Sequence, residues 1–181
     1  MTATQLMTVE QFEALPDEVT DRHELVEGEL VPVPSSTLKN SLIRDNLLFH
    51  LKSWSSSRDL AKAVSEMDVR TISGTVRRPD ISIFSAEQIG RFDMNVVPVP
   101  EPPMIAVEVL SPSEGMIAVG RKVAEYLSAG SEEIWLIDHE NREVHVRTAD
   151  AERLLRDGKT LESGLLPGFH VSVAELFSVQ R

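Results

Sequence analysis

The sequence predicts a mixed α/β fold of the α+β type, in which two substantial helices flank a mostly apolar central sheet. Between Ser36 and about Trp54, apolar residues recur at helical spacing and indicate a long amphipathic helix. The run "IAVEVL" at 105–110 is apolar on both faces apart from Glu108, as expected of a central strand covered on both sides. A second helix follows that strand, and short β-prone runs surround both helices. Helices and strands therefore alternate along the chain.

The N-terminal half begins with a short helix and a hairpin. Thr8 and Gln11 form a capping box at the start of "TVEQFEAL". Glu27-Gly28 separates two β-prone runs in "RHELVEGELVPV" and predicts a tight hairpin turn. After the long helix, "AKAVSEMDVRTI" alternates as a strand, Ser73-Gly74 predicts a turn, and "VRRPDISIF" is a further strand.

The C-terminal half continues the alternation. The proline-rich stretch at 96–103 leads into the strand "MIAVEVLS". A helix is expected from about Gly115 to Ala129, closed by Gly130 in the usual C-terminal position. The remaining elements are a hairpin turning at His139-Glu140-Asn141, a strand pair in "ERLLRDGKTLES" turning at Asp157-Gly158, and a short helix capped by Ser172.

Composition restricts the class of protein. The length of 181 residues indicates a single domain, taken as residues 1–181, and 41% hydrophobic with 26% charged residues is typical of soluble globular proteins. The chain has no cysteine, which excludes disulfides, thiolate metal sites and a thiol nucleophile. The N-terminus has no secretory signal pattern, and no apolar run approaches the roughly 18 residues of a membrane span, so we expect a cytoplasmic protein. The net charge of −11 opposes nonspecific attraction to nucleic acid or anionic membranes.

Two carboxylates interrupt the apolar pattern of the central strands. Asp80 opens "DISIF" and shares a strand face with Ser82, while Glu108 shares a face with Ala106 and Leu110. If the two strands are neighbours in register, both acids project toward one spot and repel unless a proton or cation lies between them. A hard divalent cation such as Mg²⁺ needs only one or two carboxylates. Alternatively, Asp80 caps a turn and Glu108 pairs with an arginine.

A lysine and a tyrosine follow on the next predicted helix. Lys122 and Tyr126 are four residues apart and share one helix face, so both polar ends could point toward the end of the Glu108 strand. Two acids that hold a cation, together with a lysine that orients a metal-bound water, are the parts of metal-assisted phosphodiester hydrolysis. The alternative for Lys122 is an ordinary solvated helix lysine.

Five stretches combine into a specific pattern, although each alone is weak: "HELVEGELV" (23–31), "RRPDISIF" (77–84), "VEVLSPS" (107–113), "KVAEYLSAG" (122–130) and "EEIWLID" (132–138). Together they resemble the Uma2 family of endonucleases, also called DUF820, which is placed in the PD-(D/E)xK nuclease superfamily. The resemblance runs from about residue 7 to 178. It implies a restriction-endonuclease-like fold with a central mixed sheet flanked by helices.

The resemblance also implies roles for individual residues. It places the first metal-binding acid at Asp80 and the second at Glu108. The superfamily usually has a lysine two residues after the second acid, where this chain has Leu110. The family resembles a variant of the superfamily pattern in which the lysine comes from the following helix. In this chain that lysine corresponds to Lys122. Glu24 matches the family's early glutamate, a candidate outer metal ligand or helper; the alternative is a surface glutamate of the hairpin.

The chain departs from the family pattern at two places. Many relatives carry a histidine at the start of the long helix, where "PSSTLKNSL" has none. The segment before Glu108 usually contains an aspartate, which "PPMIAVEV" lacks. Neither change touches Asp80, Glu108 or Lys122. The missing histidine therefore concerns substrate engagement more than metal binding.

Other chemistries have little support in the sequence. The five histidines do not have zinc-ligand spacing, Ser111 is not in a G-x-S-x-G motif, and neither a Walker motif nor G-x-G-x-x-G is present. Basic residues near the proposed site could form a positive rim, or be scattered solvated charges: Arg77, Arg78 and Arg121, with Lys39, Arg44, Lys52, Arg58 and Lys62 on or near the long helix.

The leading hypothesis is a Mg²⁺-dependent endonuclease, with Mn²⁺ as a substitute, that hydrolyses phosphodiester bonds in DNA. In this hypothesis Asp80, Glu108 and the Val109 carbonyl bind the metal, Lys122 positions the attacking water, and the supporting residues are Glu24 and Tyr126. The rival hypothesis is a catalytically silent dimeric binding module that retains the nuclease fold, favoured by the net charge and the missing histidine. A homodimer is expected in both cases, with the amphipathic helices or the "IWLID" hairpin as its interface.

Overall fold

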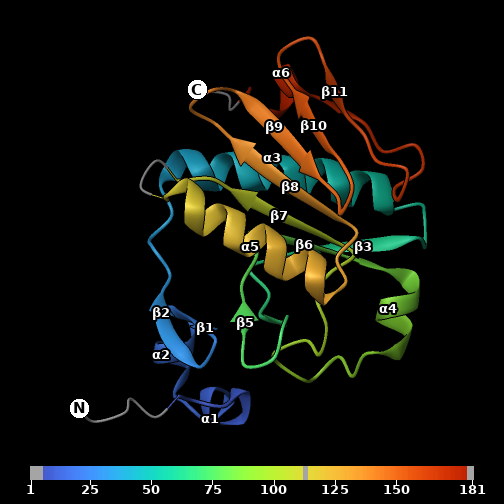
Figure 1. Cartoon of the computed structure of the whole chain (residues 1–181). Helices are drawn as coiled ribbons and strands as arrows, with labels where there is room; N and C mark the ends of the chain where they lie inside the picture. Colours follow the sequence, from blue (N-terminus) through green and yellow to red (C-terminus); the bar gives the residue numbers. More distant parts are fainter. Residues whose placement is uncertain (1–5, 112–113, 179–181) are drawn as a thin grey trace.

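Six strands form a mixed sheet at the centre of the fold, within residues 6–111 and 114–178, the part of the chain that the computed structural model describes (Figure 1). The strand order is β10–β9–β8–β7–β6–β3. β7 (Ile105–Val109) and β8 (Glu133–Asp138) run parallel, whereas the other neighbouring strands of this sheet are antiparallel. The other members are β3 (Ala61–Ser65), β6 (Ile81–Ser85), β9 (Glu143–Arg147) and β10 (Glu152–Leu155). The predicted central mixed sheet is confirmed.

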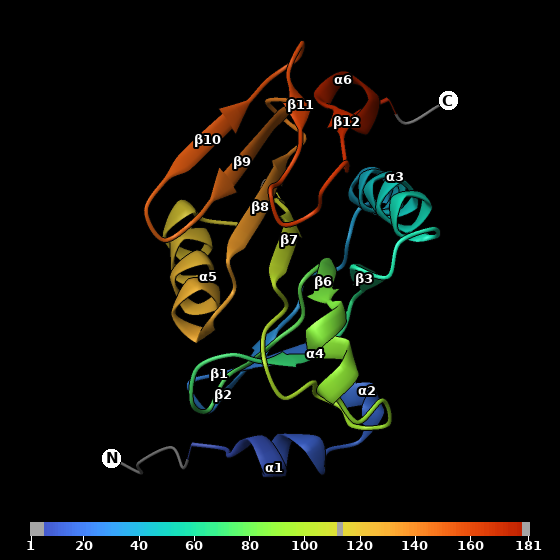
Figure 2. The ribbon, with the colours of Figure 1, turned by 90° about the vertical axis from the view of Figure 1, so that its right-hand side faces the viewer.

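The two long helices cover opposite faces of this sheet (Figure 2). α3 (Leu38–Ser55) buries one core cluster against it, and α5 (Met116–Ala129) buries a second through Val119 and Tyr126. β7 is buried along its whole length because both of its faces are covered. Among the helices of the described residues, none has the length and apolar character required to cross a membrane.

A smaller sheet lies beside one end of the main sheet (Figure 1). Its strands are in the order β2–β1–β5–β4, and β1 and β2 form the predicted hairpin. The hairpin turn has positive φ at both Glu27 (50°) and Gly28 (85°), as a two-residue type I′ turn requires. The strands are β1 (His23–Val26), β2 (Glu29–Pro32), β4 (Val69–Arg70) and β5 (Val76–Arg77).

The predicted strand "VRRPDISIF" is divided between the two sheets. It forms β5 in the small sheet and β6 in the main sheet, and Arg78-Pro79-Asp80 connects them. The predicted strand "AKAVSEMDVRTI" is divided in the same way into β3 and β4, with a positive φ of 51° at Glu66 where the chain turns. Both chain segments change sheets here, so Asp80 lies at the junction of the two sheets.

The strand pair predicted in "ERLLRDGKTLES" is wrong. β10 pairs with β9, whereas β11 (Thr160–Leu161) pairs with β12 (Val171–Ser172). Burial decides these partners: β10 extends the main sheet and buries Leu155, while Leu161 and Val171 are buried against the same core cluster. Two strands on either side of a local turn thus belong to different sheets.

Most helix ends agree with the sequence signals. The predicted caps are present: Thr8 with Gln11 at α1 (Val9–Glu13), Gly130 at the end of α5 with φ 118°, and Ser172 at α6 (Val173–Leu176). Two short helices were not predicted, α2 (Asp17–Thr20) and α4 (Ala86–Arg91). α4 does carry a signal, a capping box formed by Ser85 and Gln88.

Candidate active site

The register of β6 and β7 brings the two acidic residues together. The strands are antiparallel, with Ile81 opposite Val107 and Ser82 opposite Ala106. Continuing this register by one residue in each strand places Asp80 opposite Glu108. Residues directly opposite in an antiparallel pair point to the same face, which here is the face covered by α5. The expectation that both acids approach one spot agrees with this register.

Asp80 is anchored to the end of β7. Its Oδ2 accepts a hydrogen bond from the Val109 backbone N–H, with a donor–acceptor distance of 2.7 Å. Burial raises the pKa of Asp80, although this bond and the charges of Arg44 and Lys122 oppose the rise. A carboxylate has room for several donors or ligands, so the Val109 bond orients Asp80 without using up its oxygens.

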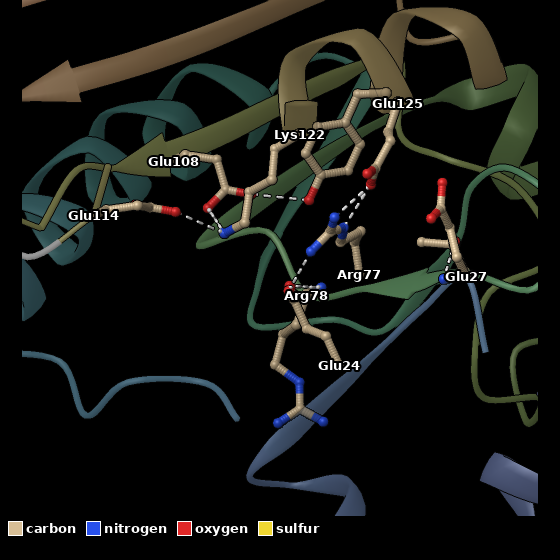
Figure 3. Close-up of polar contacts among 10 residues, drawn as sticks. Glu24, Glu27, Arg77, Arg78, Glu108, Glu114, Lys122 and Glu125 are labelled. Atoms are coloured by element: carbon tan, nitrogen blue, oxygen red, sulfur yellow. Dashed lines mark hydrogen bonds and ion pairs between the residues drawn. The ribbon is translucent and has the colours of Figure 1, made fainter. Parts of the chain in front are cut away.

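Glu108 is held by two residues of α5. The carboxylate is buried, with a residue exposure of 6%. The Tyr126 hydroxyl donates to Oε1 at 2.9 Å, and the Lys122 Nζ lies 3.5 Å from Oε2 (Figure 3). Burial raises the pKa of Glu108 to about 7, and the negative charges of Asp80 and Glu24 act in the same direction against the attraction of Lys122. The pKa of this carboxyl therefore lies near neutral pH even with the Lys122 ammonium beside it.

Lys122 stays charged in this environment. Burial by itself lowers the pKa of its ammonium, but the carboxylates of Glu108, Glu24 and Glu114 outweigh burial and raise the pKa. Glu114 Oε1 lies 3.3 Å from Nζ. Lys122 and Tyr126 thus share one face of α5 and both reach the end of β7, as their spacing predicts.

The structure places Glu24 in a buried ion network. Arg77 donates to Glu24 Oε2 at 2.8 Å through Nη1 and contacts Glu125 Oε2 at 2.6 Å through Nη2 (Figure 3). The backbone N–H of Arg78 donates to the second oxygen of Glu24 at 3.0 Å. Glu24, Arg77 and Glu125 are each about 5–6% exposed. Glu24 therefore fixes the β1–β2 hairpin to α5 through Arg77, and its charge acts on Glu108.

The arginines expected at a positive rim are largely committed to internal partners. Besides Arg77, the Arg78 guanidinium donates to both oxygens of Asp68 at 2.7 and 2.8 Å. Arg44 contacts Glu66 at 2.8 Å. Further along the predicted rim, Lys39 pairs with Glu140 and Lys62 with Asp59. Arg121 is exposed beside the cleft that contains the acids.

A cleft of about 420 Å³ opens over this group of residues. Asp80, Glu108, Glu114 and Lys122 lie together in its lining. One wall consists of β2 and the residues that follow it, including Val31 and Val33, and the opposite wall is the start of α5. Asn40 of α3 also lines the cleft. The cleft therefore connects the two acids with solvent.

The donor set fits a hard divalent cation that keeps water in most of its shell. Two carboxylates from adjacent strands lie in the cleft, together with the Val109 backbone at the end of β7. Across the described ranges, no group of three or more histidine, aspartate or glutamate side chains is placed to hold a metal ion. Mg²⁺ requires one or two carboxylates and accepts water as its other ligands. Besides burial, the negative charges of Asp80 and Glu24 raise the pKa of Glu108, and these charges would also attract a bound cation.

Sequence reasoning missed Glu114, Glu125 and Asp68. Glu125 pairs with Arg77, 48 positions away, while Glu114 and Asp68 pair with Lys122 and Arg78 on neighbouring segments. Nothing in the local sequence distinguishes these three acids from surface acids. Glu125 gives the strongest retrospective signal, since it directly precedes the inward-facing Tyr126 on a helix. Pro112 and Ser113 of the "VEVLSPS" motif lie outside the described residues.

Comparisons with known proteins identify a family and a shared fold. The family model named Uma2, described as "Putative restriction endonuclease", matches residues 9–174. A similar solved structure is titled as a putative nuclease belonging to DUF820 from Anabaena variabilis ATCC 29413. The two chains are 24% identical with a TM-score of 0.84, over 96% of this chain and 98% of the other, which establishes a shared fold. A search of curated proteins finds no matching sequence.

The metal-free stability of the chain should depend on Glu108. Since its pKa is about 7 when folded and 4.5 ordinarily, the folded state binds more protons than the unfolded state between these values. The carboxyl therefore lowers the free energy of unfolding as the pH rises from about 4.5 to about 7. Glu108→Gln removes this effect, and above pH 7 we expect it to stabilise the metal-free chain by roughly 1–3 kcal/mol.

Chemical denaturation at several pH values measures this difference. It should disappear well below pH 4.5, where the wild-type carboxyl is protonated in both states. Glu132→Gln is the matched control, because Glu132 is exposed and makes the same change of charge. A loss of stability in Glu108→Gln above pH 7 would show that the ion pair with Lys122 dominates instead.

Proposed function

Since the chain belongs to the Uma2 family, we propose that it is a metal-dependent endonuclease that hydrolyses phosphodiester bonds in DNA. One observation carries the proposal most strongly. Asp80 and Glu108 are brought opposite each other by strand register, and Lys122 and Tyr126 reach the same strand end from the following helix. Residues 1–181 would act as one nuclease domain, with the family match over 9–174 as support.

Asp80, Glu108 and the Val109 carbonyl would hold Mg²⁺, with Mn²⁺ as a substitute. Mg²⁺ bound there would lower the pKa of a coordinated water and offset the negative charge of the scissile phosphate. Before any metal binds, the chain already fixes both carboxylates. The Val109 N–H orients Asp80, and the Tyr126 hydroxyl orients Glu108 while leaving Oε2 toward Lys122. Such preorganisation limits the motion needed at the moment of reaction.

Lys122 would orient the attacking water and stabilise negative charge that develops on the phosphate. Its ammonium is charged, lies in the cleft, and is within 3.5 Å of a proposed metal ligand. Leu110 stands where the superfamily's usual lysine would be, and Lys122 brings an ammonium to the end of the same strand from α5. Glu24 would have a supporting role, since with Arg77 it fixes the hairpin that forms one cleft wall.

A catalytically silent binding module is the second candidate. Two observations favour it: the net charge of −11, and the internal pairing of Arg77 and Arg78, which leaves them poorly placed to bind phosphates. Both candidates retain the same fold, so the fold does not distinguish them. A DNA cleavage assay does.

We also propose a homodimer, which would let two sites reach both strands. The "IWLID" segment is a poor interface, since it forms β8, buried between β7 and β9. α3 is the better surface because Leu38 and Phe49 are 76% and 65% exposed. Sedimentation at micromolar concentrations tests this, and Phe49→Ser should shift the equilibrium toward monomer. A wild-type chain that sediments as a monomer at these concentrations contradicts the proposal.

Asp80→Asn should abolish Mg²⁺-dependent cleavage of supercoiled and linear DNA without unfolding the chain. Asparagine can still accept the Val109 hydrogen bond through its amide oxygen, but it lacks the charge that binds the metal. Cleavage and the Mg²⁺-induced rise in melting temperature should be lost together. Asp150→Asn, at an exposed position, is the matched control and should retain both. Full cleavage by Asp80→Asn would remove Asp80 from the metal site.

Lys122→Met should separate metal binding from catalysis. Methionine keeps most of the apolar stem, so α5 should remain packed while the charge is lost. Mg²⁺ affinity, measured by calorimetry, should hold or increase because a competing cation is removed. Cleavage should fall by about two orders of magnitude or more, as expected when a charge-stabilising group at a reacting phosphate is removed.

Lys52→Met is the control for a lysine-to-methionine change, because Lys52 is exposed on α3. Cleavage by Lys122→Met within about twofold of wild type would exclude Lys122 from the reaction. No residue would then be assigned to replace the lysine that the superfamily usually has at the position of Leu110.

A further inference from the structure

Glu114 is a second anion beside the Lys122 ammonium. Its Oε1 lies 3.3 Å from Nζ, compared with 3.5 Å for Oε2 of Glu108. Figure 3 shows Glu114 reaching Lys122 from the side opposite Arg77. The side chains of Lys122 and Glu114 are only 20% and 23% exposed, so their contact is largely withdrawn from water. The ammonium is therefore held from two sides.

The two anions differ in their other surroundings. Glu108 is opposite Asp80 and accepts the Tyr126 hydrogen bond, so it faces the place where the two acids would hold a cation. Glu114 belongs to the segment before α5. A cation at the acid pair would share the charge of Glu108 and repel an ammonium that lies 3.5 Å from this carboxylate. Of these two anions, Glu114 is the one that would still attract Lys122.

We propose that Glu114 is a positioning residue that keeps the Lys122 ammonium in the cleft when Glu108 engages a bound cation, an inference that rests on the proposed nuclease function. The lysine side chain is a point charge on a flexible four-carbon stem, so its position depends on its anionic partners. With Glu114 in place, the ammonium stays in the lining of the cleft, where it can meet a water or phosphate oxygen. Without Glu114, Lys122 would keep only the longer-range attraction of Glu24, with which it forms no ion pair among the described residues, and the same cation would displace it toward solvent.

Chemical labelling of Lys122 tests this directly and requires no catalytic activity. Wild type, Glu114→Gln and the control Glu132→Gln are acetylated with an amine-reactive reagent, with and without saturating Mg²⁺, and the Lys122 peptide is quantified by mass spectrometry. Wild type and the control should label Lys122 slowly in both conditions. Glu114→Gln should label it several-fold faster when Mg²⁺ is added. Lys62, whose side chain is 49% exposed, is the internal reference for reagent reactivity.

The kinetics of DNA cleavage test the contact between Glu114 and Lys122 through its effect on Lys122. Glu114→Gln should lower kcat by about tenfold or more, with little change in the Mg²⁺ concentration that gives half-maximal cleavage. In the Lys122→Met background, Glu114→Gln should have no further effect, because a residue that acts through Lys122 has nothing left to position.

Several results would overturn the inference. One is labelling of Lys122 in Glu114→Gln that does not respond to Mg²⁺ while the melting temperature shows that Mg²⁺ binds. A large increase in the Mg²⁺ requirement of Glu114→Gln would make Glu114 a metal ligand instead. An equal loss of cleavage with and without Lys122 would indicate an independent role. If wild type cleaves no DNA, the nuclease proposal fails, while the labelling experiment still decides whether Glu114 retains Lys122.

Discussion

The buried ion network around Arg77 is the interaction on which the candidate site depends. Arg77 lies where the chain leaves the small sheet for the main sheet, and it joins Glu24 of β1 to Glu125 of α5. Charges removed from water are costly unless each finds a partner, and loss of one partner leaves the others uncompensated. Because Tyr126 follows Glu125 directly, this network holds both the hairpin wall of the cleft and the helix that supplies Lys122.

Negative charge is in excess around the end of β7, and it raises the pKa of both Glu108 and Lys122. Burial raises the pKa of Glu108, and the charges of Asp80 and Glu24 add to this rise. The carboxylates near Lys122 keep it charged despite its burial. These carboxylates would attract a further cation. The Lys122 ammonium neutralises part of their negative charge, and a divalent ion would neutralise more of it.

Sequence reasoning reached the main sheet, its two covering helices and the two acids, because these features follow from periodicity and from charges in apolar runs. The alternation of faces predicted where Asp80 and Glu108 point, and the four-residue spacing predicted that Lys122 and Tyr126 reach the same strand end. Sequence patterns did not predict contacts between distant segments. Arg77 and Glu24 are 53 positions apart, and no local pattern indicates that they pair. The strand partners of "ERLLRDGKTLES" were missed for the same reason, since burial in the core overrode a strong local turn.

The internal pairing of the arginines beside the cleft has a consequence for how the chain would respond to ionic strength. Proteins that bind DNA through unpaired lysines and arginines displace condensed counterions, and their affinity falls steeply as salt is added. Arg77 and Arg78 are already neutralised by Glu24, Glu125 and Asp68, so they would release few counterions on contact with DNA. These two arginines would then add little to the affinity of the chain for DNA and little to the dependence of that affinity on salt concentration.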